Sequence, residues 1–326
     1  IVLQGLRGSQ LSFNFTIRFY MKGCNTMEKK FILTCASTVD LPYSYMQERN
    51  IPVIFYTYIV DGQEYVDDMG RDPLALSHFY GFLDEGKIPS TSQINVYRYV
   101  KFFEEQMQHG DVLHIGFGTG MTPSVKNAMT AADMLREKYP DRKIVVIDSL
   151  CSSSGYGMLV DTAADMRDRG CTFEETEQWV MENRQNIHHQ FFSTDLKYYR
   201  RSGRMTGATA MLASILGICP IMRLDDMGRI IAYDKVRGKS AAVRKTLDVM
   251  EEHATGGLNY NGKCWICHSN CITEAERTKA ALQKRFQHIA GDIRICDIGT
   301  IIASHCGPGT VAVFFFGDKR APYTEQ

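Results

Sequence analysis

Hydroxyl and backbone amide groups gather in the stretch "GFGTGMTPS" at residues 116–124. This stretch follows an apolar segment and precedes residues with helical spacing. At such a position, backbone N–H groups and hydroxyls can bind an anion, a carboxylate included. The stretch lacks the full G-x-G-x-x-G spacing of a dinucleotide site and the Gly-Lys-Ser/Thr of a P-loop. Thr122 can equally cap the helix with no ligand, and the sequence leaves both interpretations open.

Two ionisable side chains lie beside glycine-containing turns further along the chain. His305 precedes a Gly-Pro-Gly turn and then "TVAVFFFG", the most apolar strand-like run of the sequence. Arg204 ends the basic run "RRSGR" at 200–204. His305 either forms the polar end of an apolar pocket or lies in an ordinary loop. Arg204 is either a clamp for an anion or part of a solvated helix end.

Nucleophilic catalysis would need a nucleophile with a positioned base. The sequence contains no G-x-S-x-G elbow. Cys306 is only the sequence neighbour of His305, and "DSLCSSSG" at 148–155 supplies hydroxyls without a base. A stand-alone acyl hydrolase that uses Ser or Cys with His305 therefore remains the alternative function.

The pentapeptide "CWICH" at 264–268 matches the C-x-x-C-H pattern of covalent haem attachment. It lies in a β-like run of a chain that shows no export signal, so we expect core and edge positions of a strand instead. Together with Cys271 it offers four zinc-ligand types, but they crowd into eight residues, whereas structural zinc sites draw ligand pairs from separate segments. We predict that "CWICHSNC" binds neither haem nor zinc.

The elements that must position these side chains alternate in the first half of the chain. A strand, a small polar loop and a helix follow one another, which predicts βαβ units and a parallel sheet. Ligands of such sheets bind beyond the carboxyl ends of the strands. Three expected strand ends carry Ser, Thr or Gly loops, at Ser37-Thr38, Thr119–Thr122 and Asp148-Ser149.

The second half of the chain has a different pattern. Thr172 and Glu175 have the spacing of a capping box before a helix that we expect to include Ile187, and Thr273 with Glu276 predicts a second cap. Asp226-Met227-Gly228 predicts the turn of a hairpin, as Asp61-Gly62 does within the β-rich run at 51–65 of the first half. Helices mixed with antiparallel strands indicate an α+β domain.

Composition narrows the function classes. The 326 residues include 37 Lys and Arg against 37 Asp and Glu, so the formal net charge is zero and a nucleic-acid partner is not expected. No run approaches the ~18 apolar residues of a membrane span, so we expect no stable membrane insertion. Ten cysteines without an export signal predict reduced thiols and a cytoplasmic protein.

Seven fragments, in this order, resemble the DegV family of bacterial fatty-acid-binding proteins. They are "ILTCASTVDLP", "IPVIFYTYIVDGQEYVDD", "PSTSQ", "GTGMTPSVKNA", "VIDSLCSSSGYG", "YYRRSGRM" and "HCGPGTVAVFF". The resemblance implies an α/β fold with a parallel Rossmann-like domain at 28–168, an α+β mixed-sheet domain at 169–318, and the ligand between them. We expect residues 51–70 to pack on the second domain and 1–27 to be an upstream or added segment.

The resemblance also implies a site. A buried long-chain fatty acid would have its carboxylate held by hydroxyls at Thr91 and Thr122, with Ser92 and Thr119 beside them. The residues that match the family's head-group arginine and histidine are Arg204 and His305. The family implies no catalytic residue, metal or cofactor of its own, and presentation of the lipid to an ATP-dependent fatty acid kinase subunit.

The chain departs from the family pattern at two places. Cys35 and Ala36 stand where the family has an aspartate, which puts the role of that aspartate in doubt here. Thr122 and Pro123 replace a Ser-Gly pair, which keeps a hydroxyl but loses a flexible residue. We expect the geometry around the carboxylate to differ accordingly.

Overall fold

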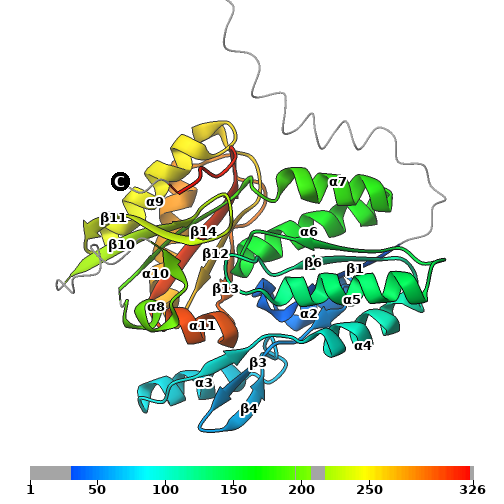
Figure 1. The fold of residues 1–326 in the computed structure, drawn as a ribbon. Helices are drawn as coiled ribbons and strands as arrows, with labels where there is room; N and C mark the ends of the chain where they lie inside the picture. The colour runs from blue at the N-terminus through cyan, green and yellow to red at the C-terminus, as the bar shows by residue number, and fades with distance from the viewer. Residues whose placement is uncertain (1–30, 195, 207–216, 324–326) are drawn as a thin grey trace, which may run out of the picture.

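The structure is a computed structural model that describes residues 31–194, 196–206 and 217–323. Its elements form three β-sheets with helices packed on them (Figure 1). The segment 1–27, for which we expect an upstream or added origin, lies outside the described residues.

A four-stranded parallel sheet forms the first layer, in the order β2-β1-β6-β7. Its strands are β1 (Ile32–Ala36), β2 (Val53–Ile54), β6 (Val112–Gly116) and β7 (Ile144–Asp148). The helices α4 (Val96–Met107) and α5 (Ser124–Lys138) lie on one side of this sheet, and α6 (Ser153–Asp168) and α7 (Phe173–Asn183) lie on the other (Figure 1). The predicted parallel sheet is confirmed.

A seven-stranded mixed sheet forms the second unit, in the order β13-β12-β14-β8-β10-β11-β9. Most neighbours are antiparallel, whereas β12–β13 and β11–β9 are parallel. The strands are β8 (Ile187–Ser193), β9 (Met205–Thr206), β10 (Ile218–Leu224), β11 (Ile230–Arg237), β12 (Cys264–His268), β13 (Arg294–Asp297) and β14 (Thr310–Phe316). The helices are α8 (Lys197–Ser202), α9 (Lys239–His253), α10 (Ile272–Arg285) and α11 (Thr300–Cys306). The predicted mixed α+β character is confirmed.

Helix α6 lies between the two sheets. It packs against β1 on one side and against β8, β12 and β14 on the other, and 14 of its 16 residues are buried. Its glycines allow this close approach: a Cβ on Gly155 would lie 2.4 Å from Nε2 of His189, and one on Gly157 would lie 2.6 Å from the carbonyl oxygen of Val39. A larger side chain at either position would push the two sheets apart.

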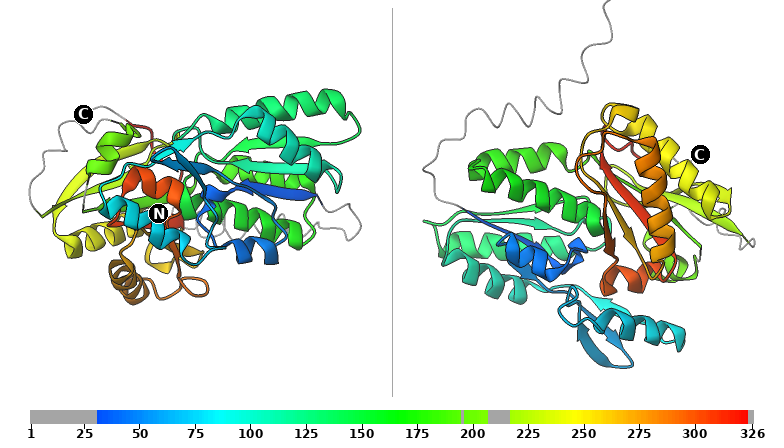
Figure 2. Two further views of the ribbon diagram at one scale, coloured as in Figure 1. Left: turned by 90° about the horizontal axis from the view of Figure 1, so that it is seen from below. Right: turned by 180° about the vertical axis from the view of Figure 1, so that it is seen from behind.

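A small antiparallel sheet, β4-β3-β5, stands beside these layers with α3 (Ala75–Asp84) (Figure 2, right). Its strands are β3 (Thr57–Val60), β4 (Gln63–Val66) and β5 (Ser90–Ser92). The predicted turn at Asp61-Gly62 is confirmed, with φ values of 51° and 82° that suit a two-residue hairpin. Strands β3 and β5 contact α11. The domain limits 28–168 and 169–318 stay predictions.

Local signals in the second half have mixed outcomes. The Thr172–Glu175 capping box is present, and Asp226-Met227-Gly228 joins β10 to β11. The second predicted cap is wrong, because α10 begins at Ile272 and Cys271 precedes it without a side-chain cap. The predicted inclusion of Ile187 in α7 is also wrong, because that helix ends at Asn183 and Ile187 opens β8. Pairing with β14 extends the backbone there.

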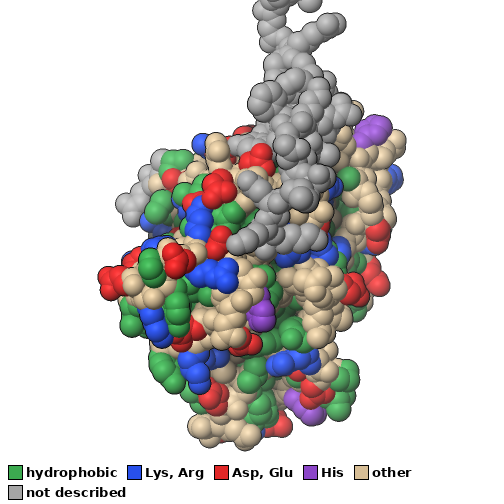
Figure 3. Space-filling view, turned by 90° about the vertical axis from the view of Figure 1, so that its right-hand side faces the viewer, with side chains coloured by type: hydrophobic (Ala, Val, Ile, Leu, Met, Phe, Trp, Pro, Cys, Tyr) green, Lys and Arg blue, Asp and Glu red, His purple; other side chains and the backbone are tan. Residues whose placement is uncertain are grey.

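Charged side chains of both signs lie on one face of the described structure. On the side shown in Figure 3, acidic and basic side chains are interspersed rather than separated by sign. Within the described residues, no helix is both long and apolar enough to cross a bilayer.

Candidate functional site

A cavity lies between the parallel-sheet half and the mixed-sheet half of the chain, and both halves supply its walls. The cavity has a volume of about 160 Å³. On the same measure one water molecule needs only ~10–15 Å³, so the cavity has room for a larger molecule. Such a mostly apolar space with a few polar groups is typical of a small-molecule site. The apolar wall consists of Phe117, Met121, Phe191, Leu224, Ile230, Ile298, Ile301, Ile302, Ala312 and Phe314.

Two predicted site residues meet at this cavity. Oγ1 of Thr91, on β5, lies 2.8 Å from Nε2 of His305, near the end of α11, although the two residues are 214 positions apart. Gly307 follows with φ 65°, and a Cβ there would lie 2.0 Å from the Tyr198 ring. The turn after α11 therefore requires glycine, and it fixes the end of the helix that carries His305.

The environment of His305 keeps its imidazole neutral. Burial, followed by the positive charges of Arg204 and Arg201, lowers the pKa of His305 to about 4. At neutral pH one ring nitrogen therefore donates and the other accepts a hydrogen bond. When Nε2 carries the proton, it donates to Thr91, and the Thr91 hydroxyl is then free to donate onward into the cavity.

Arg204 supplies a fixed positive charge to the same region. It lines the cavity just after α8, and its Nη1 donates to the carbonyl oxygen of Ser202 at 2.5 Å. Gly203, between them, is in the left-handed conformation with φ 63°. This tight turn brings the guanidinium back toward the helix end.

The remaining predicted residues divide into two groups. Thr122 and Ser92 line the cavity. Oγ1 of Thr122 also accepts a hydrogen bond from the Ser124 N–H at 3.3 Å, so it supports the start of α5 as well. Thr119 does not line the cavity, because its hydroxyl and its N–H both donate to the carboxylate of Asp148. The structure therefore joins Thr119 to the end of β7 rather than to the hydroxyls predicted to hold the carboxylate.

Several polar lining residues escaped the sequence analysis. Ser152, Ser153, His189, Tyr199, Ser202 and Thr310 all border the cavity. Nε2 of His189 accepts from the Ser152 N–H at 3.1 Å, and burial lowers the pKa of His189 well below its usual range. The run of serines was a visible signal, but nothing local distinguishes His189 from a core histidine of β8.

The first departure from the family pattern, Cys35-Ala36, is buried, whereas Pro123 of the second is exposed. Cys35 and Ala36 end β1 with no exposed surface, and burial holds the pKa of the Cys35 thiol far above its usual range. The backbone N–H of Ala36 donates to the hydroxyl of Tyr156 at 2.9 Å. Both side chains therefore belong to the core beneath the sheet end.

Of the other cysteines that the sequence analysis singled out, Cys264, Cys267 and Cys306 are buried and Cys271 is half-buried. The "CWICH" segment forms β12, and burial raises the pKa of Cys264 to about 12. Burial also raises the pKa of Cys306 to about 12, and its thiol donates to the carbonyl oxygen of Gly307. A thiol is the weak form of the nucleophile, so neither position favours thiolate chemistry at neutral pH.

Comparison with known proteins identifies the family. The sequence model of the DegV family, described as uncharacterised proteins, matches residues 30–318. The chain belongs to the DegV family. A DegV domain-containing protein of Clostridium perfringens is 33% identical over 296 residues, which cover 90% of this chain and all of that protein. A homologue from Caldanaerobacter subterraneus is 31% identical over 297 residues, covering 89% of this chain and 99% of that protein.

Solved DegV structures have the same fold. A DegV lipid-binding protein from Thermotoga maritima superposes with a TM-score of 0.77 at 22% identity, covering 89% of this chain and 99% of its own. A DegV family protein from Thermus thermophilus, described for its fatty acid binding, gives 0.76 at 23% identity over 88% and 99%. A stearic-acid-binding protein from Eubacterium ventriosum gives 0.78 at 22% identity over 88% and 98%.

Proposed function

We propose that this DegV protein binds a long-chain fatty acid in the cavity between its two halves and presents it to an ATP-dependent fatty acid kinase subunit. The observation that carries the proposal is the hydrogen-bonded pair Thr91–His305 at the border of a mostly apolar cavity. Solved relatives described as binding fatty acids give it further support.

The cavity matches the two requirements of such a ligand. Burial of the acyl chain contributes about 0.8 kcal/mol per methylene, so the apolar wall supplies most of the affinity. A buried carboxylate opposes binding unless it accepts hydrogen bonds. In the proposed arrangement His305 donates to Thr91, Thr91 donates to the carboxylate, and Thr122 and Ser92 offer further hydroxyls.

Transfer to the kinase asks more of the site than binding does. A carboxylate oxygen attacks the γ-phosphorus of ATP, the bond to the β–γ bridging oxygen breaks, and ADP leaves with its electron pair. The product is an acyl phosphate, with more negative charge than the carboxylate. Arg204 lines the same cavity, and its planar guanidinium suits phosphate oxygens. We assign the head-group role in transfer to Arg204 and His305.

We place the protein in the cytoplasm, and we propose no cofactor. All nine cysteines of the described residues are free thiols, as in a reducing compartment.

The alternative function is a stand-alone acyl hydrolase with His305 as base. Two contacts weigh against it: Nε2 of His305 bonds to Thr91, and the neighbouring Cys306 thiol is held in its protonated form by burial. Both contacts fit a binding site better than an activated nucleophile.

Mass spectrometry of lipid extracted from tag-free protein tests the proposal. We expect a long-chain fatty acid at a level near one per chain, and acyl phosphate formation only when a fatty acid kinase and ATP are added. Delipidated protein should rebind the acid and should leave aryl acyl esters intact. Protein that carries and binds no fatty acid but cleaves such esters would refute the proposal in favour of the hydrolase.

A further inference from the structure

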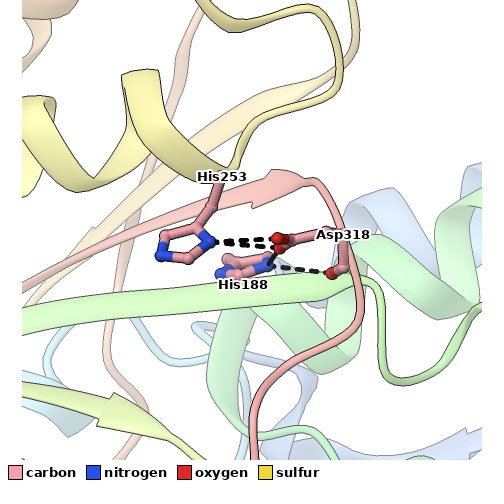
Figure 4. Close-up of side chains that lie close together, drawn as sticks. All are labelled: His188, His253 and Asp318. Carbon is pink, nitrogen blue, oxygen red and sulfur yellow. Dashed lines mark hydrogen bonds and ion pairs between the residues drawn. The ribbon is translucent and has the colours of Figure 1, made fainter. Parts of the chain in front are cut away.

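Two histidines and an aspartate from distant parts of the chain converge beside the mixed sheet (Figure 4). His188 lies on β8, His253 ends α9, and Asp318 follows β14. In the part of the chain that the structure describes, they are the one group of three or more potential ligands whose donor atoms all lie within 4.8 Å of one another. None of them lines the fatty-acid cavity.

The ligand atoms have the spacing of a metal site. Oδ1 of Asp318 lies 2.9 Å from Nε2 of His188 and 3.2 Å from Nδ1 of His253. Tetrahedral zinc with ligands at about 2.0–2.1 Å sets neighbouring ligand atoms about 3.3–3.4 Å apart, which fits both histidine–aspartate distances. The rings of His188 and His253 stack with their centroids 5.1 Å apart at 22°, so they must turn toward each other to admit the ion. His₂-carboxylate sets with one open position are a known zinc arrangement.

The backbone holds this group independently of its side chains. The N–H of Asp318 donates to the carbonyl oxygen of His253 at 3.1 Å, and the N–H of Gly317 donates to that of Asn186 at 2.8 Å. A Cβ on Gly317 would lie 2.3 Å from the His253 carbonyl oxygen and 3.0 Å from Cδ2 of His188. Glycine at this position therefore lets both histidines approach the aspartate, which is the preorganisation a metal site requires.

Access from solvent also suits a metal ion. The Asp318 side chain is 60% exposed and that of His253 is 34% exposed, which leaves an entry path from solvent.

We propose that His188, His253 and Asp318 form a binding site for a divalent transition-metal ion of the zinc class, with a solvent molecule completing the coordination. This site is separate from the fatty-acid cavity. Without metal, Nε2 of His188 and Nδ1 of His253 donate hydrogen bonds to the carboxylate of Asp318. Nε2 of His188 also donates to the backbone carbonyl oxygen of Asp318 at 3.0 Å. When the metal takes those nitrogens, the proton of each neutral ring moves to the other ring nitrogen.

The proposed metal site would stabilise hydrogen bonds that join the two halves of the chain. Arg320 lies two residues beyond Asp318, and it donates to the carbonyl oxygen of Ile187 at 2.6 Å and to that of Leu150, in the loop after β7, at 2.7 Å. An ion bound to Asp318 would fix the segment that places this arginine. We therefore expect metal to stabilise the folded protein.

Zinc titration of tag-free, metal-stripped protein by calorimetry tests the proposal. His253→Gln and Asp318→Asn are the site variants. His109→Gln, which changes an exposed histidine in the other half of the chain, is the matched control. Wild type and control should bind one Zn²⁺ per chain and melt at higher temperature with it. Since loss of an outer partner alone costs 10–100-fold in affinity, each site variant should bind at least about 100-fold more weakly. Near-ultraviolet circular dichroism in chelator should show all four proteins equally folded.

Cobalt substitution separates this site from the cysteines. With Co²⁺ bound at the proposed site, the absorption spectrum should contain no thiolate charge-transfer bands. The Co²⁺ spectrum itself should be lost in His253→Gln. Three results would overturn the proposal. Wild-type protein could bind no zinc, Asp318→Asn could bind zinc as tightly as wild type, or the Co²⁺ protein could show thiolate bands that His253→Gln leaves unchanged. Each of these outcomes leaves the fatty-acid function untouched, because no ligand of the metal site lines the cavity.

Discussion

Replacement of Thr91 by valine removes one hydroxyl and keeps a β-branched side chain of similar size. In wild-type protein that hydroxyl lies 2.8 Å from Nε2 of His305 at the cavity. We expect the variant to lose its hydrogen bond to the fatty-acid carboxylate while the strand stays folded. Ser90→Ala, an exposed change in the same strand, is the matched control.

The expected size of the effect follows from the two parts of the ligand. A hydrogen bond to a charged group contributes about 1.5–3 kcal/mol, which corresponds to about 10- to 150-fold in Kd. An acyl chain of about fifteen methylenes gains about 12 kcal/mol in gross burial. Thr91→Val should therefore weaken binding of a fatty acid without abolishing it.

Comparison of a fatty acid with the fatty alcohol of equal length isolates the head group. Both ligands bury the same chain, so the ratio of their Kd values reports the carboxylate contacts alone. We expect the Kd of the alcohol divided by the Kd of the acid to fall about 10-fold or more in Thr91→Val and to stay unchanged in Ser90→Ala. Displacement of a fluorescent fatty acid measures both constants. An unchanged ratio in Thr91→Val, with both ligands still binding, would refute the placement of the carboxylate at Thr91.

The other predictions concern charge and cysteine chemistry. Arg204→Gln should change the fatty-acid Kd by no more than about threefold but lower kinase-dependent acyl phosphate formation at least 10-fold. If binding, stability and acyl phosphate formation fall equally, Arg204 has no separate role in transfer. The folded pKa of His305, about 4, lies below the ordinary 6.5, so the unfolded chain binds more protons between these pH values and stability falls as pH falls through this window. His305→Gln should reduce that acid-side loss by about 3 kcal/mol in denaturant titrations, and identical slopes would refute the shift. Purified protein should show no Soret band, and Cys264→Ser should leave its zinc content unchanged; a Soret band, or zinc lost on this change, would disprove the structural role of "CWICH".

Some features of the fold follow from short stretches of sequence. The alternation of strand, small polar loop and helix predicted the parallel sheet, since a helical crossover lets the next strand run parallel to the one before it. The Thr172–Glu175 box and the Asp61-Gly62 turn form as predicted because their hydrogen bonds and φ values depend on residues a few positions apart. The family resemblance likewise rests on motifs that are local in the chain.

The site depends on contacts that no local signal carries. Thr91 and His305 are 214 residues apart, and only the packing of the small sheet on α11 joins them. Thr119 belongs to the same loop as Thr122, yet its hydroxyl goes to Asp148, because adjacent strand ends place that carboxylate within reach. His188, His253 and Asp318 had no recognisable spacing, and their meeting requires the pairing of β8 with β14. Sequence thus determined the elements and their capping, whereas tertiary structure decided which side chains share a site, because that choice rests on long-range packing.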